Sequence, residues 1–182
     1  MIKVSIPQLS WHNPCDFEMS FPDGWDVTTH NIAGHDRPAL SPQQIKAAIA
    51  KPIGMPPIRE MARGKKQVVI IFDDLTRSTR VAKIVPSLLE ELAAAGIPDR
   101  NIRFIAAVGT HGPMTRPDLV KKLGEEVLTR FCVYNHNAFV DLTYVGTTSF
   151  GNKVLVNTEV MNCDLKITIG FDIFPAITLS RA

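Results

Sequence analysis

Cysteine is scarce in this sequence of 182 residues, and its cysteines are widely separated. The number of cysteines is odd: there are three, at Cys15, Cys132 and Cys163. No two of them form a C-x-x-C pair. Such a set does not suit a disulfide framework, but it suits the reducing conditions of the cytoplasm. Without a C-x-x-C pair, a structural zinc site is not expected either. We therefore expect a cytoplasmic protein that is stabilised by its apolar core.

The chain also lacks a strong charge of one sign and any long apolar run. The formal net charge is +2, which is too small to indicate a nucleic-acid-binding surface. No apolar run approaches the roughly 18 residues of a membrane-spanning helix. The first residues, MIKV, lack the basic-then-apolar pattern of a signal peptide. We expect neither a nucleic-acid partner nor a membrane partner.

Several common active-site motifs are absent from the sequence. It contains neither G-x-G-x-x-G nor the G-x-x-x-x-G-K-[ST] phosphate loop. The G-x-S-x-G nucleophile elbow is missing as well. His12, His30 and His35 do not have the spacing of a metal-binding H-E-x-x-H helix, so we expect them to be loop residues.

Two strand-like runs, each followed by polar residues, organise the rest of the sequence. Residues 68–72 are β-branched or aromatic and lead into Asp73 and Asp74, and residues 102–108 lead into a glycine-rich turn. Residues 82–95 between them carry apolar side chains at helical spacing, so the three segments form a βαβ unit. A right-handed crossover places both strand ends at one edge of a parallel sheet, where ligands bind in α/β proteins.

We predict an α/β fold with a mainly parallel, doubly wound (Rossmann-like) sheet, in a single domain over residues 1–182. Further strands are expected at 131–134 and 165–169, a hairpin at 142–147 and 153–156, and helices at 43–50, 57–64, 115–123 and 159–163. Residues 1–40 are rich in turn-forming residues and predict an irregular, β-rich segment. The turn signal at 21–25 is expected between two hairpin arms.

Two arginines follow the first strand of the βαβ unit and are candidates for binding an anion. A planar guanidinium binds a carboxylate or phosphate through two parallel hydrogen bonds, so Arg77 and Arg80 at a strand end suit an anionic substrate. The alternative is structural, with both arginines forming ion pairs with Asp73 and Asp74. The sequence leaves both interpretations open.

A histidine follows the second strand and is a candidate acid/base group. The reference pKa of histidine, about 6.5, suits proton transfer by His111 near neutral pH. Asp74 is a candidate either to orient the imidazole or to bind a ligand hydroxyl. Gly109 lets the backbone approach a ligand closely, and Thr110 adds a hydroxyl. The alternatives are an ordinary loop histidine and an aspartate that caps the next helix. His136, after the third strand, either faces the same crevice or is a turn residue.

These two strand ends resemble the nickel-pincer-nucleotide lactate racemase family. Residues 74–77, DLTR, match its D-x-T-R phrase, and residues 109–113, GTHGP, match its G-x-H-x-P phrase. The supporting phrases are PIG at 52–54, NHNAF at 135–139 and GTT at 146–148. The resemblance covers residues 51–170, and the first part of the chain contributes little to it.

The resemblance implies an isomerase that racemises or epimerises a small 2-hydroxy acid. Family members use a nickel-pincer nucleotide, which accepts a hydride from the substrate Cα while a histidine removes the hydroxyl proton. Carried over by motif, His111 is one acid/base group, Arg77 holds the substrate carboxylate and Asp74 supports the same site. The residues implied to line the cofactor and substrate site are Asp74, Thr76, Gly109 and Thr110.

The sequence departs from the family pattern in three ways. Gly112 stands where the family usually has Arg, and Ser78 stands where it often has Pro. No histidine follows His136 and no lysine follows Lys166, whereas relatives continue with a second catalytic histidine, a cofactor-linked lysine and a nickel-binding histidine. We therefore expect an incomplete N-terminal domain that supplies no metal ligand and is inactive as an isolated chain.

Two other functions are compatible with the same residues. One is a non-catalytic nucleotide- or anion-binding module. The other is a hydrolase or lyase that uses Asp74 and His111 as its acid/base pair. An open sheet edge after Ile169 favours pairing with a second chain, so we also expect a homo-oligomer.

Overall fold

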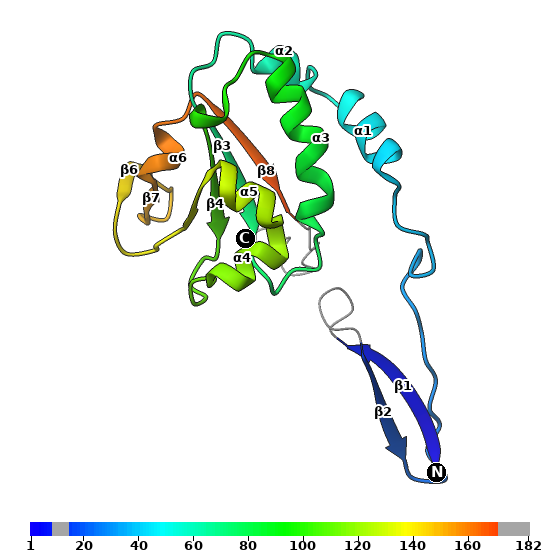
Figure 1. The fold of residues 1–182 in the computed structure, drawn as a ribbon. Coiled ribbons are helices and arrows are strands. Elements are labelled where there is room, and N and C mark those ends of the chain that lie inside the picture. Colours follow the sequence, from blue (N-terminus) through cyan, green and yellow to red (C-terminus); the bar gives the residue numbers. More distant parts are fainter. Residues whose placement is uncertain (9–14, 171–182) are drawn as a thin grey trace.

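The structure is a computed structural model that describes residues 1–8 and 15–170. Residues 171–182, which contribute to the expected departure from the family, lie outside the described residues. The strands are β1 Ile2–Gln8, β2 Cys15–Phe21, β3 Val68–Asp73, β4 Ile102–Ala107, β5 Cys132–Asn135, β6 Leu142–Thr147, β7 Lys153–Asn157 and β8 Leu165–Ile169. The α-helices are α1 Pro42–Ala50, α2 Ile58–Met61, α3 Val81–Ala94, α4 Arg116–Leu123, α5 Glu125–Arg130 and α6 Thr158–Met161. Figure 1 shows their arrangement.

Four parallel strands form the central sheet, in the order β5-β4-β3-β8 (Figure 1). Ile70 of β3 lies opposite Phe104 of β4 and Ile167 of β8. The hairpins β1–β2 and β6–β7 are antiparallel and form two separate small sheets. The predicted α/β class is confirmed, and the parallel unit β3-α3-β4 places the ends of β3 and β4 side by side.

One face of the sheet carries the main apolar core, which packs against helices α2 to α5. Phe104 of β4 is fully buried at its centre. Its ring meets Phe72 edge-on at 6.5 Å between centroids and Phe131 at 5.4 Å. These aromatic contacts fix β4 against β3 and against the start of β5, and they support the polar residues that follow β3 and β4.

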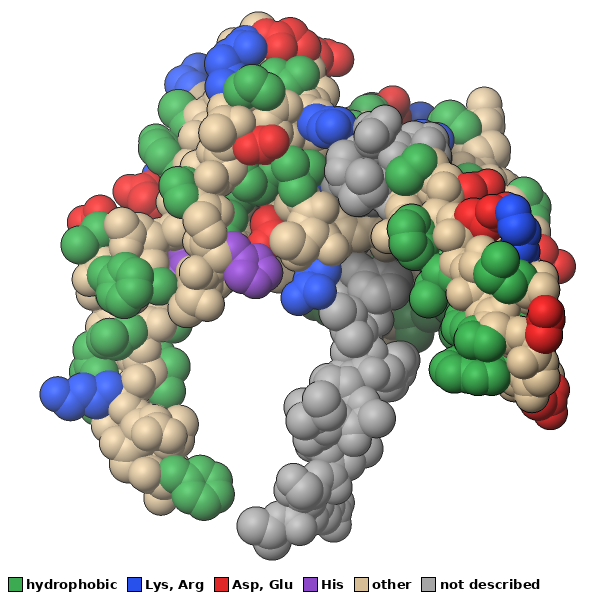
Figure 2. Space-filling model, turned by 90° about the horizontal axis from the view of Figure 1, so that it is seen from below, with side chains coloured by type: hydrophobic (Ala, Val, Ile, Leu, Met, Phe, Trp, Pro, Cys, Tyr) green, Lys and Arg blue, Asp and Glu red, His purple; other side chains and the backbone are tan. Residues whose placement is uncertain are grey.

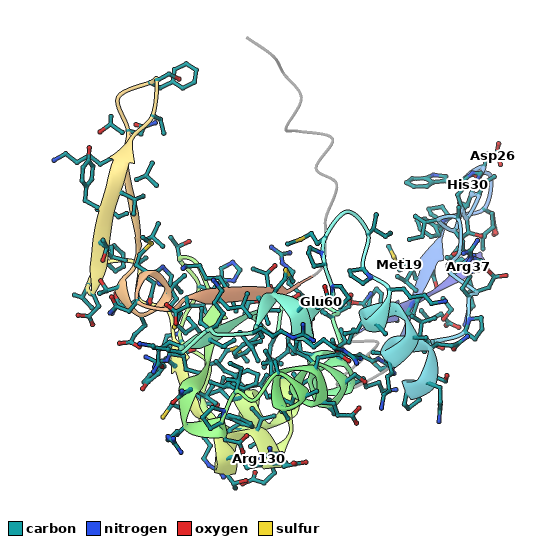
Figure 3. The ribbon with its side chains drawn as sticks, turned by 90° about the horizontal axis from the view of Figure 1, so that it is seen from above. Met19, Asp26, His30, Arg37, Glu60 and Arg130 are labelled. Carbon is teal, nitrogen blue, oxygen red and sulfur yellow. The ribbon has the colours of Figure 1, made fainter. Side chains whose placement is uncertain are left out.

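The opposite face is covered much more thinly. A second cluster consists of Val69, Ile105, Val160 and Cys163, so the short helix α6 is the helix that packs there. The predicted doubly wound (Rossmann-like) arrangement is therefore not confirmed, because the described helices gather mainly on one face. The physical reason is the connection from β5 to β8, in which the hairpin β6–β7 takes the place of a long helix. In Figure 3 this hairpin, drawn in yellow, projects from the body.

The N-terminal hairpin lies apart from the central sheet, as Figure 1 shows. The β-rich segment predicted over residues 1–40 contains the β1–β2 hairpin, but the predicted position of the hairpin turn is wrong. Ile2 pairs with Phe21, so the two arms precede residues 22–25 instead of flanking them. Asp23 and Gly24 do form a turn, and the segment 25–40 that follows contains no strand. This segment has turn-forming residues such as Gly34 and Pro38 and no alternating apolar run to pair with β2.

The helix starts follow the expected capping chemistry. The Ser41 hydroxyl accepts a hydrogen bond from the backbone nitrogen of Gln44, whose side-chain oxygen accepts one from the backbone nitrogen of Ser41. Thr115 and Asp118 form the same type of capping box before α4. Helix α5 is not predicted by the sequence analysis. It begins directly after Gly124, whose φ of 91° breaks the helix into α4 and α5.

Within the described ranges 1–8 and 15–170, no helix combines the length and the apolar character that crossing a membrane requires.

Candidate functional site

The predicted site residues meet at the carboxyl ends of β3 and β4. A pocket of about 250 Å³ is lined there by Asp73, Asp74, Arg77, Ala107, Val108, Gly109, Thr110 and His111. The first three residues lie at or just after the end of β3 and the others lie at or just after the end of β4, so the parallel pairing of the two strands creates the pocket. Figure 2 views the molecule from below and shows histidine side chains close to acidic and basic ones. Arg77 and His111 line the same pocket, in agreement with the prediction that the two strand ends lie at one edge of the sheet.

Asp74 and His111 form a close pair within this pocket. The Nδ1 atom of His111 lies 2.5 Å from Oδ2 of Asp74. The Asp74 side chain is 8% exposed and the His111 side chain is 51% exposed, so the carboxylate is the buried member. An ionised carboxylate only accepts hydrogen bonds, which places the imidazole proton on Nδ1 and leaves the Nε2 lone pair for a ligand. This is the arrangement of a general base with an orienting aspartate.

Asp74 also organises the turn that follows β3. Its Oδ1 accepts hydrogen bonds from the backbone nitrogen of Thr76 at 2.8 Å and from the Thr76 hydroxyl at 2.5 Å. Burial raises the pKa of Asp74, but the hydrogen bonds from Thr76 and His111 outweigh it and hold the pKa below the ordinary value. Asp74 is therefore ionised at neutral pH, as the tautomer of His111 requires.

The structure separates the two candidate arginines. Arg77 is partly buried and lines the pocket, and its backbone nitrogen donates to the carbonyl of Asp74 at 3.2 Å. Arg80 is exposed, is not part of the pocket lining and stands directly before α3. Asp74 pairs with His111 and Asp73 pairs with Lys122. Arg77 is thus the guanidinium placed to meet a ligand in this pocket.

The predicted cofactor-lining residues divide into two groups. Gly109 and Thr110 border the pocket and are exposed. Gly109 has a φ of 59°, so a glycine is favoured there by the backbone conformation. Thr76 is not part of the pocket lining, and its hydroxyl acts on Asp74. Thr76 therefore supports the site through the carboxylate.

A neighbouring pocket of about 250 Å³ shares Gly109, Thr110 and His111 and adds residues that follow β5. Among them is His136, whose Nδ1 lies 3.3 Å from the side-chain nitrogen of Asn157. His136 therefore lies in the second pocket, on the side of His111 away from Arg77, because β5 borders β4 on the edge opposite β3 in the sheet. The N-terminal histidine His30 contacts Thr28 and lies with Asp26 and Arg37 apart from the central sheet (Figure 3).

Lys122 is the residue near the site that the sequence analysis misses. Its side chain is fully buried, with Nζ 2.7 Å from Oδ1 of Asp73. Its helical spacing could have indicated that Lys122 is buried, because it shares one buried face of α4 with Leu119 and Leu123. A lysine at helical spacing with two core leucines must find a partner inside the protein.

The described residues offer no metal centre of their own. Within ranges 1–8 and 15–170, no group of three or more His, Cys, Asp or Glu side chains is arranged to hold a metal ion. This part of the chain therefore presents an acid/base pair and a guanidinium, and any metal would need ligands from elsewhere.

The described residues form an α/β fold with a pocket at the carboxyl ends of parallel strands. Comparison with known proteins identifies the family: the model of the lactate racemase N-terminal domain matches residues 15–174. The lactate racemase of Lactiplantibacillus plantarum is 34% identical over 135 residues, which are 72% of this chain and 32% of that protein. The lactate racemase of Thermoanaerobacterium thermosaccharolyticum is 30% identical over 129 residues, which are 70% of this chain and 30% of that protein.

Solved structures show the same fold. The lactate racemase apoprotein from T. thermosaccharolyticum has a TM-score of 0.68 at 23% identity, over 92% of this chain and 38% of that one. A Thermotoga maritima protein has a TM-score of 0.56 at 22% identity, over 71% of this chain and 33% of that one. The chain belongs to the lactate racemase N-terminal domain family, as the sequence motifs predicted. It spans about a third of the length of the curated relatives that it matches.

Proposed function

We propose that the pocket is the substrate-binding part of a racemase or epimerase site for a small 2-hydroxy acid. Family membership supports a racemase-like function, and one observation supports the site: Arg77 and the Asp74–His111 pair line the same pocket. A guanidinium binds a carboxylate through two hydrogen bonds. The substrate carboxylate would bind Arg77, and the 2-hydroxyl of the substrate would face Nε2 of His111.

The charge on Asp74 determines the role of His111. Because Asp74 accepts the Nδ1 proton, Nε2 is free to take the hydroxyl proton of the bound acid. The imidazolium formed in this step would remain next to the carboxylate, which stabilises it. Return of the proton by His111 on the same face would regenerate the starting enantiomer, so inversion would need the second catalytic histidine that the family resemblance implies.

When the hydroxyl loses its proton and the acid becomes a ketoacid, the Cα hydrogen would leave as a hydride, and no amino-acid side chain accepts one. By family resemblance we propose a nickel-pincer nucleotide, which supplies that chemistry when bound, next to Gly109, Thr110 and Asp74. A Cβ built on Gly109 would meet no atom within 4 Å, so the backbone there is open to a ligand. The described residues do not by themselves fit a nickel centre. We therefore propose that this chain alone binds the acid without racemising it.

The sheet topology supports the location of the site. Numbered along the chain, the strand order β5-β4-β3-β8 is 3-2-1-4, which is the order of the first four strands of a doubly wound sheet. We propose this topology for the family domain, with its switch point between β3 and β8. Ligands bind beyond the strand ends at such a point. A Cβ on Gly170, after β8, would lie 3.9 Å from Oδ2 of Asp73, so both strand ends border the same region.

Replacing Arg77 with alanine tests this function. We expect the affinity for lactate, measured by isothermal titration calorimetry on the 182-residue chain, to fall by about tenfold or more, because a charge-assisted hydrogen bond is lost. Arg80→Ala is the matched control: it removes the same charge from the same turn, outside the pocket lining. We expect Arg80→Ala to bind lactate as the wild-type chain does. Equal affinity in wild type and Arg77→Ala would contradict the proposal.

A further inference from the structure

Lys122 links helix α4 to the turn that carries Arg77. Its Nζ donates a hydrogen bond to the backbone carbonyl of Arg77 at 3.0 Å and lies 2.7 Å from Oδ1 of Asp73. The lysine side chain has no exposed surface, whereas the Asp73 side chain keeps 14% exposure. The ammonium group therefore cannot reach a ligand in the pocket and can act only through the residues that it holds.

Asp73, the last residue of β3, and Asp74 hold different parts of the turn that follows the strand. Asp74 binds the backbone nitrogen and the hydroxyl of Thr76. Asp73 accepts a hydrogen bond from the hydroxyl of Thr79 at 2.6 Å and faces Lys122, which in turn holds the carbonyl of Arg77. Arg77 thus lies between two fixed points, and its backbone has little freedom to move the guanidinium away from His111.

A buried ammonium group is costly, because it loses its hydration when the protein folds. An ion pair in such a place is often no more stable than apolar side chains of similar volume, so stability alone does not account for Lys122. Leu119 and Leu123 on the same face show that an apolar residue would suit this position. The geometry instead gives the lysine a specific task, because among the described residues its Nζ contacts both the end of β3, through Asp73, and the backbone of Arg77.

We propose that Lys122 is a positioning residue that fixes the turn so that Arg77 faces the pocket of His111. This inference rests on the proposed function, because it assigns Arg77 to the substrate carboxylate. In this account the lysine contributes neither charge nor hydrogen bonds to the substrate. It fixes the position of the Arg77 backbone. That position determines whether one small acid can place its carboxylate on Arg77 and its hydroxyl on His111 at the same time.

Lys122→Met, the double variant Asp73→Asn/Lys122→Met and the control Lys121→Met separate positioning from stability. Lys122→Met removes the ammonium that faces Asp73, so we expect the melting temperature to fall by about 5 °C or more. The double variant removes both charges, and we expect its melting temperature to return close to that of the wild type. Lys121 is exposed, and its replacement should change nothing.

Two measurements then decide the proposal. By calorimetry with lactate, the double variant should bind at least about tenfold more weakly than the wild type, although its stability is restored. By ¹⁵N relaxation without ligand, the amides of residues 76–79 should be mobile in both Lys122 variants and rigid in Lys121→Met. A double variant with a rigid turn would overturn the role of Lys122, and so would one with wild-type affinity. If wild-type protein does not bind lactate, the proposed function fails, and the relaxation data still decide whether Lys122 fixes the turn.

Discussion

Replacing Asp74 with asparagine should keep the fold, reverse the tautomer of His111 and lower the free energy of unfolding by about 2–3 kcal/mol at pH 7. The amide oxygen of asparagine can still accept the two hydrogen bonds from Thr76, so the turn retains its shape. The amide nitrogen then faces Nδ1 of His111 and donates to it. The lost free energy is that of a charge-assisted hydrogen bond to a buried group.

The tautomer is the functional consequence of this substitution. With an amide donor at Nδ1, the ring proton moves to Nε2, and the nitrogen that faces the ligand can no longer accept the hydroxyl proton. The ¹⁵N chemical shifts of the His111 ring report which nitrogen is protonated. We expect the two ring signals to exchange their character between wild type and Asp74→Asn. Unchanged ring signals would contradict the role that we assign to Asp74.

The stability difference between these two proteins should also depend on pH. The pKa of Asp74 is lower in the folded protein than its ordinary value, so the carboxylate stabilises the fold above that value. Its contribution disappears as the pH falls through the folded pKa. Urea denaturation should therefore show that the difference between wild type and Asp74→Asn is present at pH 7 and shrinks below about pH 4.

Replacing Phe104 with alanine should have the largest effect on stability, a loss of about 3–5 kcal/mol in the free energy of unfolding. The ring is fully buried and packs edge-on against Phe72 and Phe131, so its removal leaves a cavity between β4 and its neighbours. A domain of this size has a free energy of unfolding of about 5–15 kcal/mol, so this loss is a large part of it.

Chemical denaturation followed by circular dichroism measures this loss, with Phe150→Ala as the control. Phe150 lies at the tip of the β6–β7 hairpin and is 85% exposed, so its removal should change stability by less than about 0.5 kcal/mol. Similar losses in both variants would show that the main core lies elsewhere.

The central part of the fold could be predicted from the sequence because local and tertiary preferences agree there. The apolar run of β3, the apolar stripe of α3 and the caps before α1 and α4 all favour the elements that form. The rule that parallel strands end at one edge was sufficient to bring Asp74, Arg77 and His111 together. For the two turns this inference needed no side-chain detail, because strand pairing alone places them side by side.

Other features depend on pairings that no local pattern encodes. The turn signal at residues 22–25 is real, but whether it joins two strands depends on what β2 pairs with, and β1 proved to be its partner. Arg77 and Arg80 were equivalent in the sequence, since only the bonds of Asp73, Asp74 and Lys122 determine which of them faces the pocket. The sequence alone does not distinguish a buried lysine such as Lys122 from an exposed one, because burial depends on how the helix packs.

The most direct test of the account compares lactate with propionate, which is the same acid without the hydroxyl. Each is titrated into ¹⁵N-labelled protein while the Arg77 Nε–H and the His111 ring signals are followed by NMR. We predict that lactate shifts both sets of signals at one common affinity, whereas propionate shifts that of Arg77 alone. If lactate perturbs one residue without the other, the two groups do not bind a single acid and the account is contradicted.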